Sequence, residues 1–531
     1  MKRIIIYFAA LIAAINIIAC DESKLDLKSQ SAYDFSTYFT SSDGLNQAVI
    51  ATYATLLHNG LWSREYYFIF DLLGHEAKKT TNLQGDMAQL ADYSFGTSQA
   101  QIGQLWNSLY RMVLRSNVVI DRASVWQPTV AADQQKAKQF IAEARFLRSY
   151  AYFNIVNLWG KAPLITAYDS TVANNYPTRS SAEALWSFIE NDLTLAAADL
   201  PVTYDAATGL GRATKGAAIA LLGKTYLYQK KWAQAQTTLA QLTAAPYTYS
   251  LDPSYENLFS STNQSSPENI FQIMNAKWTD WGIGNQYYVF GGQETWGGKA
   301  SHSDRAQEYG FKDWFNVYVP TTTVKAFQYP NPSTGAAYVD PRAKFTFYGN
   351  KESGGDTEYC QKCEGGKIAF PFKADDPQGY FVWKKYQYYN EVASYGGPQS
   401  SINGQVIRYA DILLMLAESY IQQGKTGEEP LALINQVRKR SGAVAYTTLG
   451  AQAAATNLLI RERQIELCGE QSRYFDLIRW GIAKQTINSQ RAAEPGDGKQ
   501  PFLDKNVLLP IPDVEKNYNP NVAKDIANGW N

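Results

Sequence analysis

The chain has 531 residues, of which 45% are hydrophobic, so it can bury one large core or several smaller ones. Its 49 basic residues balance its 49 acidic residues, which argues against the basic surface that a nucleic-acid-binding protein needs. Four cysteines are too few for a fold held together by disulfide bonds.

The N-terminus has the pattern of a lipoprotein signal peptide. Two basic residues precede an apolar run from Ile4 to Ile18, which is shorter than the roughly 20 residues of a membrane-spanning helix. Ala19 then precedes Cys20, which would become the lipid-carrying N-terminus after cleavage. We predict a signal peptide over residues 1–19 and lipidation at Cys20. The alternative is a plain secretory signal with an incidental cysteine.

Much of the remaining chain shows the apolar spacing of helices. In two places, 219–226 and 413–420, apolar or small residues fall at i, i+3, i+4 and i+7, on one helix face. Gly223 and Ala417 are the small residues that would let paired helices approach, as in tetratricopeptide repeats. Further helices are predicted over about 43–58, 101–124, 134–159, 182–199 and 455–468.

Between about 247 and 400 the helical period is lost, and Gly, Asn, Thr, Tyr and Trp become frequent. We interpret this segment as a loop-rich insertion, and a shorter stretch of the same kind spans 61–96. The predicted fold is mainly α: a tetratricopeptide-like helical-repeat scaffold, at about 40–246 and 401–490, with a large loop-rich insertion carrying short strands. Residues 20–531 are predicted to form a single domain.

Four tryptophans gather between 278 and 314, where an even spread of the thirteen would put about one. They lie among glycines and polar residues, as binding-loop aromatics do. Aromatic rings stack on the apolar C–H face of a pyranose and amides bond its hydroxyls, so we predict a sugar site; some of the tryptophans would instead anchor the loop. The predicted contacts are Trp278, Trp281, Asn285, Tyr287, Trp296 and Trp314, with a second face from Trp62 and Tyr67 beside Arg64, Tyr66, Asn82 and Asp86.

The sequence lacks the motifs of common catalytic sites. It has no Gly-x-Ser-x-Gly, no His-Glu-x-x-His and no phosphate loop, and only three histidines. A glycoside hydrolase stays open as an alternative, because its two carboxylates need no local motif. Cys360 and Cys363 form a single Cys-x-x-Cys, which we interpret as a loop disulfide or two inert thiols, with a metal site second. We predict no catalytic residue, metal or cofactor.

Four blocks of sequence identify a family that the chain resembles. They are AEARFLRSYAYFNIVNLWGKAPL (142–164), RYADILLMLAESY (408–420), RERQIELCGEQSRYFDLIRWG (461–481) and NVLLPIPDVEKNYNPN (506–521). In this order, behind a lipoprotein leader, they resemble the SusD/RagB family. The charged residues of the third block are interpreted as helix-face and turn ion pairs that define the fold; they are Glu462, Glu466, Glu470, Arg473 and Arg479.

The resemblance implies a non-enzymatic lipoprotein of the outer membrane, facing the cell surface. Such a protein captures an oligosaccharide and delivers it to a SusC-like TonB-dependent transporter. Asp21 and Glu22 are similar to the signal that sends these lipoproteins to the surface. The expected partners are therefore the transporter, the oligosaccharide and the membrane through the N-terminal lipid, without nucleic acid. A peptide ligand on the same fold is the main alternative.

Overall fold

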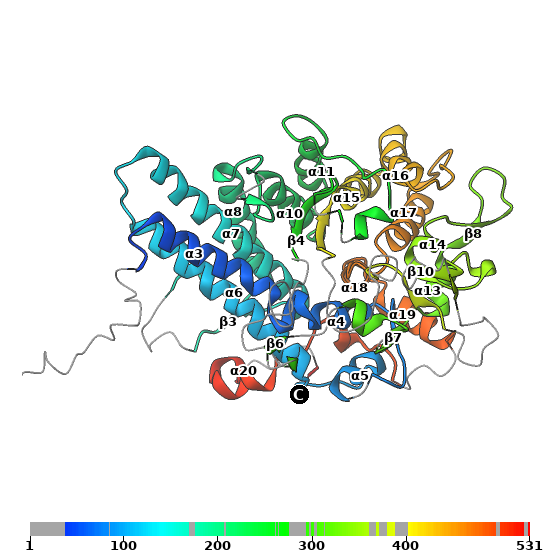
Figure 1. Cartoon of the computed structure of the whole chain (residues 1–531), viewed down its shortest axis with the longest axis horizontal. Helices are drawn as coiled ribbons and strands as arrows, with labels where there is room; N and C mark the ends of the chain where they lie inside the picture. Colours follow the sequence, from blue (N-terminus) through cyan, green and yellow to red (C-terminus); the bar gives the residue numbers. More distant parts are fainter. Residues whose placement is uncertain are drawn as a thin grey trace, which may run out of the picture.

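The computed structural model describes most of the chain, which is drawn in Figure 1. The described residues are 38–83, 85–168, 176–205, 209–260, 262–263, 265–275, 294–296, 299–301, 305–312, 314–359, 368–370, 380–387, 402–494, 500–524 and 529–530, with only the backbone of 294–296, 299–301 and 368. Within these residues, no helix combines the length and apolarity that crossing a bilayer requires.

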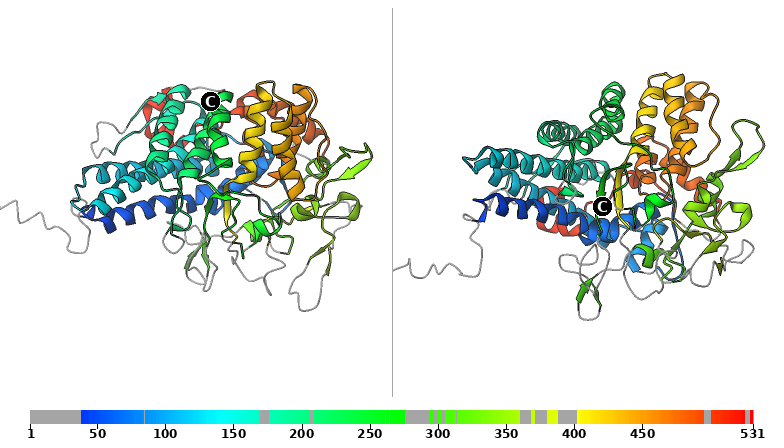
Figure 2. Two further views of the ribbon diagram at one scale, coloured as in Figure 1. Left: turned by 90° about the horizontal axis from the view of Figure 1, so that it is seen from above. Right: turned by 45° about the horizontal axis from the view of Figure 1, so that its top comes forward.

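Paired helices build the scaffold. Its longer helices are α3 (Ser42–Tyr53), α6 (Ala100–Val125), α7 (Ala131–Trp159), α8 (Ala182–Asp199), α10 (Lys215–Tyr228), α11 (Trp232–Ala240), α15 (Tyr409–Gln422), α16 (Glu428–Arg440) and α17 (Gln452–Glu466). Successive helices pack from α6 to α11, and α11 packs on α15, so the two predicted scaffold segments form one stack (Figures 1 and 2). The mainly α, tetratricopeptide-like fold class is confirmed, and the predicted helices are present within a few residues of their expected bounds.

Close approach within this stack depends on a glycine. A Cβ atom at Gly223 in α10 would collide with the side chain of Leu239 in α11. Only glycine therefore lets these two helices come this close. The start of α10 is fixed by Thr214, whose hydroxyl accepts from the Ala217 amide over 3.2 Å. The predicted close packing at Gly223 is confirmed, and Ala417 in α15 is fully buried.

The stretch 61–96 contains helices, so its interpretation as loop-rich is wrong for much of its length. It holds most of the π-helix η3 (Asn59–Ser63), and all of α4 (Glu65–Leu73) and α5 (Gly85–Asp92). Every residue of α4 is buried. Its sequence, EYYFIFDLL, is thus buried on all sides, and the helix presents no polar face to solvent.

The described part of the insertion carries short strands, as predicted. Its longest pair joins β4 (Asn269–Ile273) antiparallel to β14 (Gly404–Arg408), which leads directly into α15. The other pairs among the described residues are β1 (Lys78–Lys79) with β7 (Val317–Tyr318), β5 (Glu294–Trp296) with β6 (Lys299–Ser301), β8 (Gln328–Pro330) with β9 (Ala337–Val339), β10 (Phe347–Tyr348) with β13 (Val382–Trp383), β11 (Glu358–Tyr359) with β12 (Ile368–Ala369) and, in the scaffold segment, β2 (Ala162–Pro163) with β3 (Arg179–Ser180). The remaining α-helices are α12 (Arg305–Tyr309), α13 (Thr321–Ala326), α14 (Ala343–Thr346), α18 (Arg473–Arg479), α19 (Ala483–Ala492), α20 (Asp513–Tyr518) and α21 (Pro520–Lys524).

Buried ion pairs fasten the insertion to the scaffold. Arg342, in the insertion, bonds Glu466 of α17 over 2.9 Å. Glu268, next to β4, accepts from Arg408 at the start of α15 over 2.7 Å. Burial opposes ionisation of Glu466, but Arg440, Arg408 and Arg342 together hold its pKa well below the usual range. Glu466 is ion-paired, but its predicted place in helix-face or turn pairs is wrong, because its pairs lie in the core and join distant segments.

Candidate functional site

The two stretches predicted to hold the ligand lie against each other. Strand β1, in the stretch 61–96, pairs with β7, in the insertion at about 247–400. Beside this pair, the Asn82 side-chain amide donates to the Trp314 carbonyl over 2.9 Å. Arg64 donates from Nε to the Glu308 carboxylate over 2.6 Å. Segments more than 230 positions apart in the sequence therefore share one face of the protein.

A buried aspartate anchors this face. Asp71 of α4 forms an ion pair with Arg305 of α12 over 2.7 Å. It also accepts hydrogen bonds from the Tyr309 hydroxyl over 2.8 Å and from the Gln471 amide over 3.0 Å. Burial raises the pKa of Asp71, and the Arg305 charge opposes that rise. One carboxylate thus fixes α12 and the turn before α18 against α4.

An open hollow of about 880 Å³ lies where the two stretches meet, and we call it the outer hollow. Its lining residues are Arg64, Asn82, Leu83, Gly85, Asp86, Met87, Gln101 and Asn316. Most of these offer side-chain donors or acceptors of the kind that pair with sugar hydroxyls. Glu308 and Glu65 hold the Arg64 guanidinium in place, over 2.6 Å and 3.4 Å.

A second, narrow space, the loop-side cavity, lies beside α12. It is lined by Trp62, Tyr67, Asn275, Arg305, Ala306, Tyr386, Ile402, Gly404 and Gln471. The Arg305 guanidinium lies 4.4 Å from the centre of the Tyr386 ring. Among the described residues, the Tyr386 hydroxyl, Gln471 Oε1 and Arg305 Nε have no hydrogen-bond partner. Buried polar atoms without partners are costly, so a polar ligand or water that met them would be stabilised.

Two stretches that lie largely outside the described residues are flanked by residues of this cavity. We call residues 278–314, where the four tryptophans gather, the aromatic window; Asn275 and Arg305 lie on either side of the segment that holds most of it. Tyr386 and Ile402 lie on either side of another segment, around 388–401. The predicted contacts outside the described residues are Trp278, Trp281, Asn285 and Tyr287. Trp296 is the last residue of strand β5, and its side chain also lies outside the described part of the structure.

Trp62 and Tyr67 line the loop-side cavity as a wall. The Trp62 side chain is only 9% exposed and stacks on Tyr66 with ring centres 4.8 Å apart. Its indole N–H donates to the Tyr150 hydroxyl over 2.9 Å. Tyr67 is 3% exposed, whereas Trp314, beside the outer hollow, is partly exposed. These three residues thus belong to the same face: Trp62 and Tyr67 are buried beneath it, and Trp314 lies at its surface.

Sequence reasoning missed Arg305, Tyr386 and Gln471 as lining residues. Their positions match no motif, because each comes from a different segment. One signal was available: Asp71 lies in the otherwise apolar run of α4, and a buried carboxylate needs a cation or several donors. That signal predicts a partner for Asp71, although not which residue provides it.

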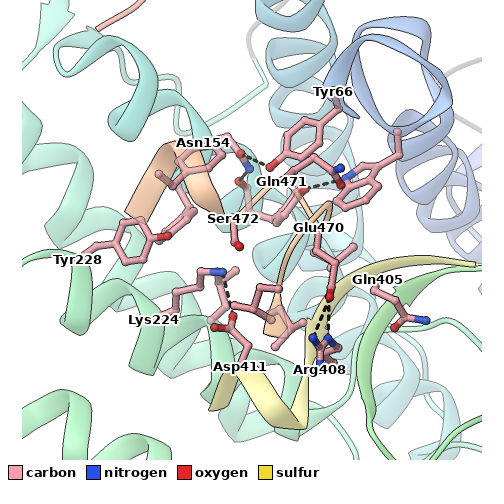
Figure 3. A pocket seen from close by; sticks show the side chains of 18 residues that line it. Tyr66, Asn154, Lys224, Tyr228, Gln405, Arg408, Asp411, Glu470, Gln471 and Ser472 are labelled. Atoms are coloured by element: carbon pink, nitrogen blue, oxygen red, sulfur yellow. Dashed lines mark hydrogen bonds and ion pairs between the residues drawn. The ribbon is translucent and has the colours of Figure 1, made fainter. Parts of the chain in front are cut away.

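Behind Trp62 lies a narrow inner cavity, which Figure 3 shows. Helices α4, α7, α10 and α15 and the segment 467–475 contribute its walls. Its charges pair with one another: Lys224 bonds Asp411 over 3.2 Å, and Arg408 bonds Glu470 over 2.6 Å. Although burial opposes ionisation, Lys224 and Arg463 hold the pKa of Asp411 below its usual range. These charged groups are therefore held in ion pairs within the fold.

The chain matches two family models. One, described as the SusD family, matches residues 267–530. The other, described as starch-binding and associating with the outer membrane, matches residues 25–227. The chain belongs to the SusD family. The predicted family resemblance is confirmed.

Relatives within the SusD family are distant in sequence but span most of the chain. SusD-like protein P2 of Formosa agariphila is 25% identical over 505 residues, which cover 92% of each chain. A SusD superfamily protein from Bacteroides vulgatus superposes with a TM-score of 0.75 at 24% identity, over 92% of this chain and 99% of its own. A structure described as a laminarin binding SusD-like protein has a TM-score of 0.66 at 23% identity, over 90% of this chain and 97% of its own. The two solved structures share the fold of this chain along most of its length.

Proposed function

We propose that this SusD-family chain captures an oligosaccharide at the cell surface and hands it to a SusC-like TonB-dependent transporter. The observation that carries the proposal is the joint face on which a polar outer hollow lies beside an aromatic loop-side cavity. A sugar presents both hydroxyls and an apolar ring face, so it is matched by such a pair of surfaces. The starch-binding description of one family model and the laminarin-binding neighbour support a glycan ligand.

In this proposal the aromatic window supplies the stacking rings. Trp314 lies beside the outer hollow through the bond from Asn82 to its carbonyl. Asn275 and Arg305, which flank the rest of the window, line the loop-side cavity. The proposed contacts are Trp278, Trp281, Tyr287, Trp296 and Trp314 for stacking and Asn285 for hydroxyls, with Trp62 and Tyr67 as the inner wall.

The carboxylates of the three spaces favour binding over hydrolysis. A glycoside hydrolase brings two carboxyl groups to about 5 to 9.5 Å from each other across the scissile bond. Among the described residues, the outer hollow is lined by one carboxylate, Asp86, and the loop-side cavity by none. Asp411 and Glu470 of the inner cavity are held in ion pairs. We therefore propose a binding protein that leaves its ligand intact.

Titration calorimetry with oligosaccharides of laminarin, starch and xyloglucan tests this proposal, with a peptide panel alongside. We expect binding to at least one glycan, no binding to peptides, and no new reducing ends after prolonged incubation. Binding to peptides alone would favour the peptide alternative. Release of reducing ends by the purified protein would overturn the non-catalytic role.

The proposal includes a lipid anchor on Cys20 and a position at the outer-membrane surface. The leader and Cys20 lie outside the described residues, so the support is the leader pattern itself. The outer-membrane description of the family model that matches residues 25–227 supports the same location. An anchored chain would hold captured ligand close to its transporter.

A further inference from the structure

A fourth space opens on the scaffold side of β4. It has a volume of about 920 Å³, and we call it the tyrosine groove. Residues on the chain before α10, the turn after α11 and strand β4 line it. Its main side chains are Tyr204, Leu210, Arg212, Tyr247, Tyr249 and Asn269.

Two parallel aromatic rings form one wall of the groove. Tyr247 and Tyr249 lie 5.8 Å apart between ring centres, with an angle of 7° between their planes. Both are only partly buried, and Leu210 on the same groove is 50% exposed. Gly216 admits Tyr249, because a Cβ atom there would collide with the tyrosine hydroxyl. The fold thus holds Tyr249 in place and leaves an apolar surface open to solvent.

The polar part of the groove suits a neutral ligand. Among its described lining residues there is no carboxylate, and the one cation, Arg212, already bonds Glu143 over 2.9 Å. Asn269 donates to Gln272 over 2.7 Å, while its own buried Oδ1 has no partner among the described residues. That oxygen can accept a hydrogen bond from a hydroxyl. Open aromatic rings with an unpaired amide oxygen and no free charge match the ring face and hydroxyls of a sugar.

The groove adjoins the loop-side cavity. Gln272 lines the groove and Asn275 lines the cavity, so their Cα atoms are at most about 11 Å apart, given the reach of three residues. Asn403 connects them: its amide donates to Gln272 over 3.2 Å, and its oxygen accepts from the Asn275 backbone over 2.9 Å. A chain of a few sugar units is long enough to reach from one space to the other.

We propose that the tyrosine groove is a second sugar-binding subsite, which takes the part of a neutral oligosaccharide that extends beyond the loop-side cavity. This inference rests on the proposed function. Because the two spaces adjoin, binding at the first raises the effective concentration of the same chain at the second. The groove therefore selects long ligands over short ones without changing contacts at the first space.

Tyr247→Ala tests the groove, and Tyr518→Ala is its control, because Tyr518 is 60% exposed on α20 and lines none of these spaces. The probes are the polysaccharide that binds best in the glycan panel and its trisaccharide. Tyr247→Ala should weaken polysaccharide binding by roughly tenfold, as expected for one lost stacking ring, and leave trisaccharide binding unchanged. Tyr518→Ala should leave both unchanged. Hydrogen exchange in residues 247–250 should slow with the polysaccharide and not with the trisaccharide.

Unchanged polysaccharide binding by Tyr247→Ala would refute the groove as a subsite and leave the proposed function of the loop-side cavity and outer hollow unaffected. Equal weakening for polysaccharide and trisaccharide would also overturn it, because Tyr247 would then act at the first space. If the wild-type protein bound a peptide in the groove and no glycan, the sugar assignment would be wrong. If it bound no ligand of the panel, the proposed function and the groove would fail together.

Discussion

Replacing Arg305 with methionine should loosen the candidate site, because it leaves a buried carboxylate without its cation. Arg305 and Asp71 lie 2.7 Å apart, with side chains 10% and 0% exposed. Removing one partner of a buried ion pair costs about 3 to 5 kcal/mol. Asp71 keeps hydrogen bonds from Tyr309 and Gln471. We therefore expect the lower end, about 3 kcal/mol of unfolding free energy, measured by urea unfolding.

A double variant separates the ion pair from lost packing. Adding Asp71→Asn to Arg305→Met removes the orphaned charge and should recover at least about 1 kcal/mol. The loss of unfolding free energy in Arg305→Met should also become smaller as the pH falls, because the unpaired Asp71 carboxyl then binds a proton. Lys484→Met is the control: its pair with Asp504 is exposed, at 52% and 83%, and its loss should cost no more than about 0.5 kcal/mol. Equal losses in the two single variants, or no recovery in the double variant, would refute this reasoning.

Three further changes test the scaffold, a buried carboxyl and the anchor. Gly223→Leu would force a side chain into Leu239 and should lower stability by about 1 to 3 kcal/mol; an unchanged melting temperature would count against close helix packing. Burial, with repulsion from Asp71, raises the pKa of Glu76 from 4.5 to about 8. The contribution of Glu76 to the free energy of unfolding is full below pH 4.5 and is lost as the pH rises through 8. Glu76→Gln should therefore make the free energy of unfolding, measured in urea, depend less on pH across that window. An unaltered pH profile would contradict the raised pKa. Cys20→Ala should move the protein from the membrane fraction to the soluble fraction, and retention equal to wild type would rule out the lipid anchor.

Much of the scaffold was predictable because its helices keep one polar face. Helices α6 and α8 show the 3.6-residue apolar period, and their bounds lie within a residue or two of those expected. Helix α4 was not predictable in this way, since its nine residues are all buried and it keeps no exposed polar face. The role of Glu466 was also hidden, because its arginine partners come from segments far away in the sequence.

The candidate site was predictable as two stretches but not as one surface. Aromatic and glycine content marked both stretches, whereas their pairing rests on two-residue strands that leave no sequence pattern. Asp71 indicates that a cation lies near α4, but the chain has 49 basic residues and only the fold selects Arg305. Trp62 was expected as a contact, and its place as a buried wall depends on Tyr66 and Tyr150 packing around it.

A residue at the far end of helix α6 provides a control variant for the ligand site. Gln101, at the start of α6, lines the outer hollow, whereas Trp126 follows the end of the same helix. At 1.5 Å per residue, the two are about 38 Å apart. Trp126→Ala should therefore leave ligand affinity unchanged, although Trp126 packs against the core at its own end of the helix.

The measurement that tests the central claim most directly is calorimetric titration of the best-binding glycan into single tryptophan variants, with a thermal melt of each. Trp281→Ala and Trp296→Ala should each weaken binding roughly thirtyfold, since losing a central anchor costs about 2 kcal/mol or more. Their melting temperatures should stay at the wild-type value, because a ring that contacts ligand adds little to the core. If Trp278, Trp281, Trp296 and Trp314 can each be replaced without weakening binding, the ligand does not bind at this face.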